Sequence, residues 1–244
     1  MTTLLMTGTI APPAGARQLA VRDVGVRLAA YRSALAFNRR LLDRGAIGRL
    51  VFVENSGHGM DEMEDLVAGD PRVALLSYDG SGDGVGATRF FGECSLLRHA
   101  FRYIDGLRDD SRGPVFKVTG RYVVRNLAAL LARVGGRYDV ALHCRNYPTR
   151  YVDFGLAGFR ASRALDVLDR ILARPGIENE DERVLRRMLD EGAFDGLRVL
   201  QRLPRVPDFV GVRGKDGASY GGLRYRAKYA LRAVTQRVAP AIWI

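Results

Sequence analysis

Short apolar runs alternate along this chain with longer amphipathic stretches, and this alternation constrains the fold more than any other feature. The runs predicted as strands lie at 3–10, 48–57, 72–78, 115–124 and 138–145. Between them, helical patterns place apolar residues three and four positions apart, as at 24–45 and 92–107. Strands separated by helices favour an α/β fold with a mostly parallel central sheet flanked by helices.

The composition is compatible with one folded domain. The chain has 244 residues, of which 47% are hydrophobic, so a sizeable core can form. No apolar run approaches the ~20 residues that a membrane-spanning helix needs. The first residues lack the basic segment and the long apolar segment of a secretory signal, so we expect a cytoplasmic protein. Cys94 and Cys144 are then expected to be core thiols and not a disulfide.

The charge of the chain indicates an anionic partner. The formal net charge is +11, and most of the basic residues are arginine. Nucleic acid, an anionic membrane surface or a phosphorylated substrate would each match this charge. The basic residues are dispersed, and no zinc finger or RNA-recognition motif occurs, so no nucleic acid is expected.

Polar, glycine-containing segments follow four of the predicted strands. Their sequences are TGTIAPP, ENSG, YDGSGDGVG and TGRY. In parallel sheets the carboxyl ends of the strands meet at one edge, where ligands bind. The sequence therefore predicts a binding cleft at this edge of the sheet.

The predicted strand within PVFKVTGRYVVRN carries charged side chains. Alternation along a strand would place Lys117, Thr119 and Arg121 on one face. Buried charge requires a partner. That partner is either a set of acidic residues in the scaffold or an anionic ligand, and the residues alone leave both interpretations open.

The sequence resembles a group of bacterial glycosyltransferases from polysaccharide and surface-glycan gene clusters, which have a nucleotide-diphospho-sugar transferase (GT-A-like) core. The resemblance covers roughly Leu4 to Asn126. It is carried by LLMTGTIAPP, RLAAYRSAL, VFVENSG, FGECSLLRHAF and, above all, KVTGRYVVRN. A weaker similarity continues through YVDFGLAGFR, ENEDERVL and FVGVRGKDGASY.

The resemblance implies a single GT-A-like, Rossmann-type α/β domain. Its parts would be a nucleotide-sugar-binding half (1–126), an acceptor-side half (127–222) and a basic amphipathic tail (223–244). The implied activity is transfer of a sugar from a nucleotide-diphosphate donor to a glycan, lipid-linked or other hydroxyl acceptor. Many such enzymes hold a metal with Asp-x-Asp where the fourth strand ends. This chain has Thr119-Gly120-Arg121 there. We therefore expect no cofactor and no divalent metal held at this position.

The hypothesis that follows is that a side-chain cation replaces the metal. The donor diphosphate would meet Arg121 and Lys117, with Thr119 and with Gly120, whose missing side chain lets a phosphate approach the backbone. Arg89 is a further candidate for contact with the donor diphosphate. The alternative is that it is a solvent-exposed arginine in a loop. The glycine-rich segment before it is not a Walker motif.

Further site residues are expected after the first two strands and in the helix that follows the glycine-rich segment. Nucleoside contacts are predicted for Thr7, Gly8, Thr9, Glu54, Asn55 and Ser56. Plain turns and strand ends are the alternative for these residues. Glu93 is a candidate contact to the donor sugar because the family has a glutamate there, although a helix-cap role is equally open.

An inverting transferase needs a carboxylate to accept the proton of the acceptor hydroxyl. Asp153 and Glu182 are the catalytic candidates, and the sequence does not choose between them.

The tail from Leu223 to Arg237 alternates basic with apolar residues, which suits an anionic membrane surface at the inner face of the plasma membrane or a helix packed on the domain. A nucleotidyltransferase on a similar fold and a non-catalytic basic binding module remain the competing functions.

Overall fold

The computed structural model describes residues 1–244 except 16–18, 68, 81–86, 214–215, 240–241 and 243–244. Its centre is a seven-stranded sheet in the order β10-β6-β9-β4-β1-β2-β3. The strands are β1 (Thr3–Gly8), β2 (Arg49–Glu54), β3 (Val73–Ser77), β4 (Val115–Thr119), β6 (Val140–Ala141), β9 (Leu156–Phe159) and β10 (Val199–Leu200). All neighbours pair in parallel except β9, which is antiparallel to β4 and β6. The predicted fold class, α/β with a mostly parallel sheet, is confirmed.

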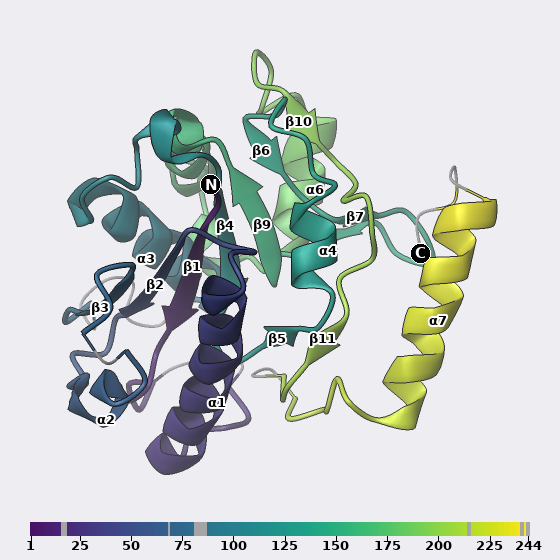
Figure 1. Ribbon diagram of the computed structural model, residues 1–244. Coiled ribbons are helices and arrows are strands. Elements are labelled where there is room, and N and C mark those ends of the chain that lie inside the picture. Colours follow the sequence, from purple (N-terminus) through teal and green to yellow (C-terminus); the bar gives the residue numbers. More distant parts are fainter. Residues whose placement is uncertain (16–18, 68, 81–86, 214–215, 240–241, 243–244) are drawn as a thin grey trace.

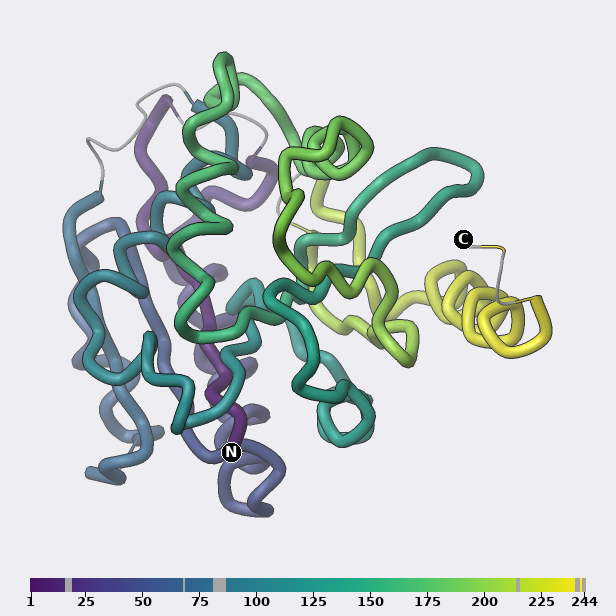
Figure 2. The backbone as a smooth tube through the Cα atoms, turned by 90° about the horizontal axis from the view of Figure 1, so that it is seen from above, coloured from purple at the N-terminus to yellow at the C-terminus, as the bar shows by residue number. Residues whose placement is uncertain are grey.

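Helices cover both faces of this sheet (Figures 1 and 2). They are α1 (Val24–Asp43), α2 (Asp61–Glu64), α3 (Arg89–Tyr103), α4 (Leu127–Leu131), α5 (Ala164–Leu172), α6 (Arg183–Asp190) and α7 (Leu223–Val238). Short 3-10 turns lie at Asp110–Arg112, Ala161–Arg163 and Ile177–Asn179. Two small antiparallel pairs complete the described chain: β5 (Val123–Val124) with β11 (Phe209–Val210), and β7 (Cys144–Arg145) with β8 (Tyr151–Val152).

Strand alternation divides the core into two layers. Leu4 and Met6 of β1 pack with α1 and α4, whereas Leu5 points to the opposite face, where α3, α5 and α6 lie. The strands are therefore buried on both sides, which explains why they appear in the sequence as continuous apolar runs.

Local sequence sets the start of the two long helices that flank the amino-terminal strands. Asp23 caps α1, because its Oδ1 accepts a hydrogen bond from Val26 N at 2.8 Å. Thr88 caps α3 in the same way through Phe91 N at 3.4 Å. Such caps satisfy amide groups that have no partner within the helix. Helix α3 begins at Arg89, three residues before its predicted start, so Arg89 and Glu93 both lie in its first turns.

The predicted strand 115–124 was wrong in its second half. β4 ends at Thr119, and Gly120 donates its N–H to Thr7 O at 2.8 Å, so the chain turns before β5. A Cβ on Gly120 would lie 2.7 Å from Thr7 O, which only a glycine avoids. The turn takes Arg121 off the strand, and it does not share a strand face with Lys117 and Thr119.

Helix α7 lies at the side of the molecule and has no buried residue (Figure 1). Its inner side contacts the domain through Tyr225, which packs against Tyr220 and the core, and through polar bonds such as that from Gln236 Nε2 to Leu203 O at 2.8 Å. Its outer side exposes Leu223, Leu231 and Val234. No helix among the described residues is long and apolar enough to cross a membrane.

Candidate functional site

A buried cluster around Glu93 lies at the carboxyl edge of the central strands. Glu93 Oε1 accepts hydrogen bonds from Thr7 Oγ1 at 2.8 Å and Thr119 Oγ1 at 2.9 Å, and lies 2.7 Å from Lys117 Nζ. Lys117 is fully buried, and its ammonium also donates to Phe154 O. Burial acts to raise the pKa of Glu93, but the charges of Lys117 and Arg89 outweigh it and hold that pKa below its usual value.

This cluster decides between the two interpretations left open for the charged strand. The ammonium of Lys117 has no exposed surface, and its carboxylate partner comes from α3. The structure therefore corrects the prediction that Lys117 presents its charge to a donor diphosphate. Thr7, Thr119 and Gly120 are also buried, and the space beside Gly120 is filled by Thr7 O. These residues support the edge of the sheet from inside.

Arg121 lies after the turn and is 6% exposed, with no ion pair to a carboxylate among the described residues. Its Nη1 is 3.5 Å from Val212 O, and its buried Nε has no hydrogen-bond partner in that part of the chain. A buried guanidinium without a counter-charge is costly. Arg121 is therefore a buried cation whose charge no described carboxylate neutralises.

A second buried arginine accompanies it, and sequence reasoning missed it. Arg27 of α1 is 2% exposed and donates from Nε to Thr9 O at 2.7 Å and from Nη1 to Val21 O at 3.1 Å. It forms no ion pair with a carboxylate in the described ranges. Burial lowers the pKa of Arg27, and the nearby charge of Arg121 lowers it further. Two neighbouring cations thus lie between the end of β1 and the turn after β4.

Glu54 connects the loops that follow β1 and β2 with the last residue of β3. Its fully buried carboxylate accepts hydrogen bonds from Ile10 N at 2.8 Å, His58 N at 3.2 Å and Ser77 Oγ at 3.0 Å, and from both Ser56 N and Ser56 Oγ. Every one of these bonds is internal. Glu54 is therefore placed to hold these segments together from inside the fold.

The partly exposed residues of the predicted nucleoside group are Thr9, Asn55 and Ser56. Thr9 Oγ1 donates to Asn55 Oδ1 at 2.6 Å, and Ala11 N donates to Ser56 Oγ at 2.9 Å. The structure brings these three together beside the loop after β1. Gly8 is buried against Phe52, whose Cζ would lie 2.7 Å from a Cβ at that position.

Glu182 and Arg89 join the acceptor side of the predicted site to α3. Arg89 Nη2 lies 2.5 Å from Glu182 Oε1, and Tyr151 donates its hydroxyl to Glu182 Oε2 at 2.5 Å. Burial raises the pKa of Glu182, and it stays raised although Arg89 and the Tyr151 hydrogen bond lower it. The carboxylate raises the pKa of Arg89 in spite of the opposing effect of burial. Tyr151 was not found from the sequence, because a hairpin tyrosine carries no local signal.

Asp153 lies between β8 and β9 with 9% of its surface exposed. Its Oδ2 is 2.5 Å from Arg145 Nη2, and its Oδ1 accepts from Gly155 N at 3.3 Å. Its charge contributes to raising the pKa of both Glu182 and Tyr151. The two predicted catalytic carboxylates therefore lie in one electrostatic cluster, which also includes the unpredicted Arg145.

One predicted feature cannot be placed. The glycine-rich segment before α3 falls largely on 81–86, outside the described residues. Among the residues that the structure describes, no group of three or more His, Cys, Asp or Glu side chains could hold a metal ion.

No family profile and no curated protein matches the sequence. Solved structures do match. The inositol-1-phosphate CTP transferase from T. maritima covers 98% of this chain and 97% of its own, with a TM-score of 0.50 and 12% identity. The 4-diphosphocytidyl-2C-methyl-D-erythritol synthase from Anaerococcus prevotii covers 95% and 97%, with the same TM-score and identity. At this identity the two matches show a shared fold.

A galactosyltransferase, LgtC, solved with donor and acceptor sugar analogs, also matches. The similarity covers 68% of this chain but only 60% of that chain, with a TM-score of 0.43 and 11% identity. The two matches with a TM-score of 0.50 show that this chain shares the α/β fold of those two transferases, and the site residues must carry any statement about its chemistry.

Proposed function

We propose that this protein is a glycosyltransferase that moves a sugar from a nucleotide-diphosphate donor to a hydroxyl acceptor without a metal held by Asp-x-Asp. The observation that carries the proposal is the Arg27–Arg121 pair. Both arginines are buried at the carboxyl edge of the sheet, where ligands bind in such folds. They have no carboxylate partner among the described residues, and the planar guanidinium fork of arginine fits phosphate oxygens.

In this proposal the bond between the anomeric carbon and the diphosphate oxygen breaks, and the negative charge develops on the leaving diphosphate. Arg121 stabilises that charge directly, with Arg27 beside it, and electrostatic stabilisation of this kind is a large part of transferase catalysis. Arg89 is the third cation, at the side facing Glu182. The nucleoside is held by Thr9, Asn55 and Ser56.

Glu182 is the proposed base, and it accepts the proton that the acceptor hydroxyl loses as the new glycosidic bond forms. Its raised pKa suits a general base better than that of an exposed glutamate. Asp153 is the alternative, and its carboxylate is paired with Arg145 as that of Glu182 is paired with Arg89. Glu93 in this scheme positions Thr7 and Thr119 beneath the donor.

The acceptor would be a glycan or a lipid-linked hydroxyl compound. The outer side of α7 supports peripheral contact with an anionic membrane, because apolar residues are exposed there between Arg224, Lys228 and Arg237. The helix contains no acidic residue. Such docking would place a cytoplasmic enzyme at the inner membrane face.

A nucleotidyltransferase is the second candidate, favoured by the two structural matches with a TM-score of 0.50. That chemistry releases pyrophosphate from a nucleoside triphosphate and ordinarily uses Mg²⁺ held by carboxylates. A non-catalytic basic binding module is the third, and it gives no role to the paired buried arginines.

The test is a thermal-shift panel with UDP, GDP, TDP, CDP and CMP, each with Mn²⁺ and with EDTA, because a ligand of the folded state raises the melting temperature. We expect a selective shift with one diphosphate that persists in EDTA and disappears in Arg121→Ala, but not in the exposed control Arg108→Ala. Release of that diphosphate from a nucleotide sugar, followed by chromatography, then identifies glycosyl transfer.

Three outcomes would overturn the proposal. Pyrophosphate release from a nucleoside triphosphate would assign the protein to nucleotidyl transfer. A shift that requires Mn²⁺ would contradict the role of the arginines. Absence of any nucleotide shift, together with salt-sensitive binding to anionic vesicles or RNA, would favour the binding module.

A further inference from the structure

Helix α7 exposes its apolar residues on one side, which we call the apolar stripe. At 3.6 residues per turn, these residues fall within an arc of about 80° around the helix axis. They are Leu223, Ala227, Leu231, Val234 and Val238, all exposed. Tyr225, Tyr229 and Gln236, which contact the domain, lie on the opposite side of the helix. The apolar stripe therefore points away from the domain.

Basic residues border the apolar stripe along both of its edges. Arg224 and Lys228 follow one edge, and Arg226 and Arg237 follow the other. All four are exposed, and within the described chain none of them forms an ion pair with a carboxylate. An apolar stripe between two rows of cations is typical of a helix that lies in the headgroup layer of an anionic membrane.

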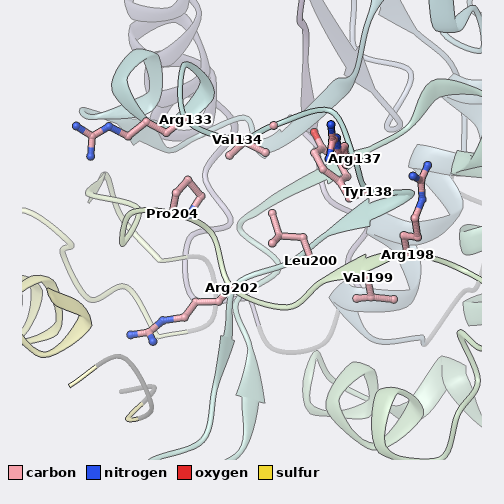
Figure 3. Close-up of a pocket in the computed structure, with 10 residues that line it drawn as sticks. Arg133, Val134, Arg137, Tyr138, Arg198, Val199, Leu200, Arg202 and Pro204 are labelled. Atoms are coloured by element: carbon pink, nitrogen blue, oxygen red, sulfur yellow. The ribbon is translucent and has the colours of Figure 1, made fainter. Parts of the chain in front are cut away.

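A second group of arginines lies around a cavity between the end of α4 and the strands β6 and β10, and it differs from the cations of α7. Figure 3 shows that these side chains extend in different directions and do not converge: Arg133, Arg137, Arg198 and Arg202. One ligand could not meet them together. The cations of α7 border a single stripe, so one extended anionic surface can contact all of them.

The hairpin formed by β7 and β8 has an exposed tip. Residues 146–149, Asn-Tyr-Pro-Thr, are all exposed, and Tyr147 has 66% of its surface exposed. These four residues carry no charge, so contact with lipid headgroups removes no charge from water. Arg150, which follows them, pairs with Asp190 at 2.8 Å. Tyrosine is enriched at the boundary between membrane and water, because its ring is apolar and its hydroxyl is polar.

The hairpin and α7 project on the same side of the molecule, as both Figure 1 and Figure 2 show. The charges at the start of the hairpin also reach α7. Burial lowers the pKa of Arg232 on α7, and the nearby charge of Arg145 on β7 lowers it further. A flat surface that contacts α7 on this side therefore lies close to the hairpin tip.

We propose that the tip of the β7–β8 hairpin is a second contact with an anionic membrane, at the level of the lipid headgroups, beside the contact made by α7. This inference rests on the membrane contact of α7 in the proposed function. Tyr151 of the same hairpin donates its hydroxyl to Glu182 at 2.5 Å. A tip held among the headgroups turns the proposed base toward the bilayer, which favours an acceptor anchored in the membrane.

The test introduces a single tryptophan at either of two exposed tyrosine positions. Trp243→Phe removes the only tryptophan of the sequence, and Tyr147→Trp or Tyr103→Trp then adds one. Tyr103 is the matched control, because it is 69% exposed and ends helix α3, far from α7 in Figure 1. In phosphatidylglycerol vesicles with spin-labelled headgroups, we expect the tryptophan at position 147 to be quenched at least roughly twofold more than that at position 103.

Serine substitutions provide a second measurement, by co-sedimentation with phosphatidylglycerol vesicles. Tyr147→Ser should weaken binding roughly threefold, whereas Tyr103→Ser should leave it unchanged. Arg121→Ala should keep the quenching at position 147, so that failure of the proposed donor site is distinguished from failure of this contact. Equal quenching at both positions, in vesicles that capture the protein, would overturn the hairpin contact and leave that of α7. Absence of vesicle binding would overturn both contacts, and RNA binding in its place would assign the α7 cations to nucleic acid.

Discussion

Lys117 Nζ and Glu93 Oε1 lie 2.7 Å apart and join the central strand β4 to helix α3 beneath the candidate site. Lys117 is completely buried, and the same glutamate oxygen also accepts hydrogen bonds from Thr7 and Thr119. One carboxylate oxygen thereby fixes two adjacent strand ends and a helix. The proposed donor site depends on this fixed edge, although the pair itself does not face solvent.

Replacing Lys117 with Met should destabilise the fold by about 3–5 kcal/mol, because it leaves Glu93 as an uncompensated buried charge. Urea unfolding followed by circular dichroism measures this loss. The double variant Lys117→Met/Glu93→Gln should lose less than the sum of the single variants, since neither charge remains. A loss below about 1 kcal/mol for Lys117→Met would contradict the buried pair.

Acid should destabilise the protein through His143, which is 3% exposed. Burial lowers the pKa of His143 from 6.5 to about 3, and the charge of Arg145 contributes. Between these values the unfolded state binds the extra proton, so stability falls as the pH falls, by about 1.4 kcal/mol per pH unit for this residue. His143→Gln should show a shallower decline between pH 6.5 and 4 in urea titrations. If the unfolding free energy of the parent and of His143→Gln fell equally with pH, His143 would bind its proton as readily in the fold as in the unfolded chain.

Arg121→Met should separate stability from binding. Because Arg121 has no carboxylate partner in the described chain, the free energy of unfolding should stay within about 1 kcal/mol of the parent protein or rise. Affinity for the preferred nucleoside diphosphate should fall roughly tenfold or more. Arg125→Met is the matched control, because Arg125 pairs with Asp208 at 2.9 Å, and that variant should keep its nucleotide affinity. Retained affinity in Arg121→Met would remove the residue from the site.

Tyr151→Phe should move the acid limb of the pH–rate profile to higher pH. The Tyr151 hydroxyl donates to Glu182 and thereby lowers the pKa of that carboxylate, which burial otherwise raises. Without the hydroxyl the pKa of Glu182 rises further, and the base loses its proton only at higher pH. Initial rates across pH 5–9 measure the shift. An unchanged acid limb would assign the base to another group, with Asp153→Asn the next variant to measure.

Leu231→Glu with Val234→Glu on α7 should abolish binding to anionic vesicles. Both side chains are exposed, at 61% and 56%, on a helix with basic but no acidic residues. Co-sedimentation with phosphatidylglycerol vesicles should capture the parent protein at low salt and less of it at high salt. Ala227→Gln, at an exposed position of the same helix, is the mild control. Equal sedimentation of all three proteins would show that the apolar side chains of α7 do not bind the membrane.

The amino-terminal part of the sheet was predictable because its strands are long, buried on both faces and separated by helices. β6 lies within the predicted strand 138–145 but has only two residues, β10 also has two, and β9 runs antiparallel, so hydrophobic pattern alone did not give the lengths and directions of these strands. The turn at Gly120 depends on its hydrogen bond to Thr7 O, a tertiary contact. Without it the sequence pattern continues as a strand, which is why Arg121 was placed on the wrong face.

Several residues of the candidate site were named from the sequence, but their partners were not. Arg89, Glu93, Asp153 and Glu182 were all named, and the structure brings them close enough for their charges to interact. Lys117 and Glu93 lie on different elements, and their separation along the sequence does not indicate that they pair. Arg27 had the sequence pattern of a solvated helix arginine, and only its contact with Thr9 O reveals its burial.

The buried carboxylate of Glu54 also bears on how the proposed preference for a nucleotide could change over evolution. The loops after β1 and β2 and the last residue of β3 are all anchored to this one side chain. Substitutions at Thr9 or Asn55 can therefore alter the surface offered to a base while the backbone beneath them keeps its shape. Under the proposed function, a lineage that retained Glu54 could exchange one nucleotide for another in small steps, whereas loss of Glu54 would disturb two loops and the end of β3 at once.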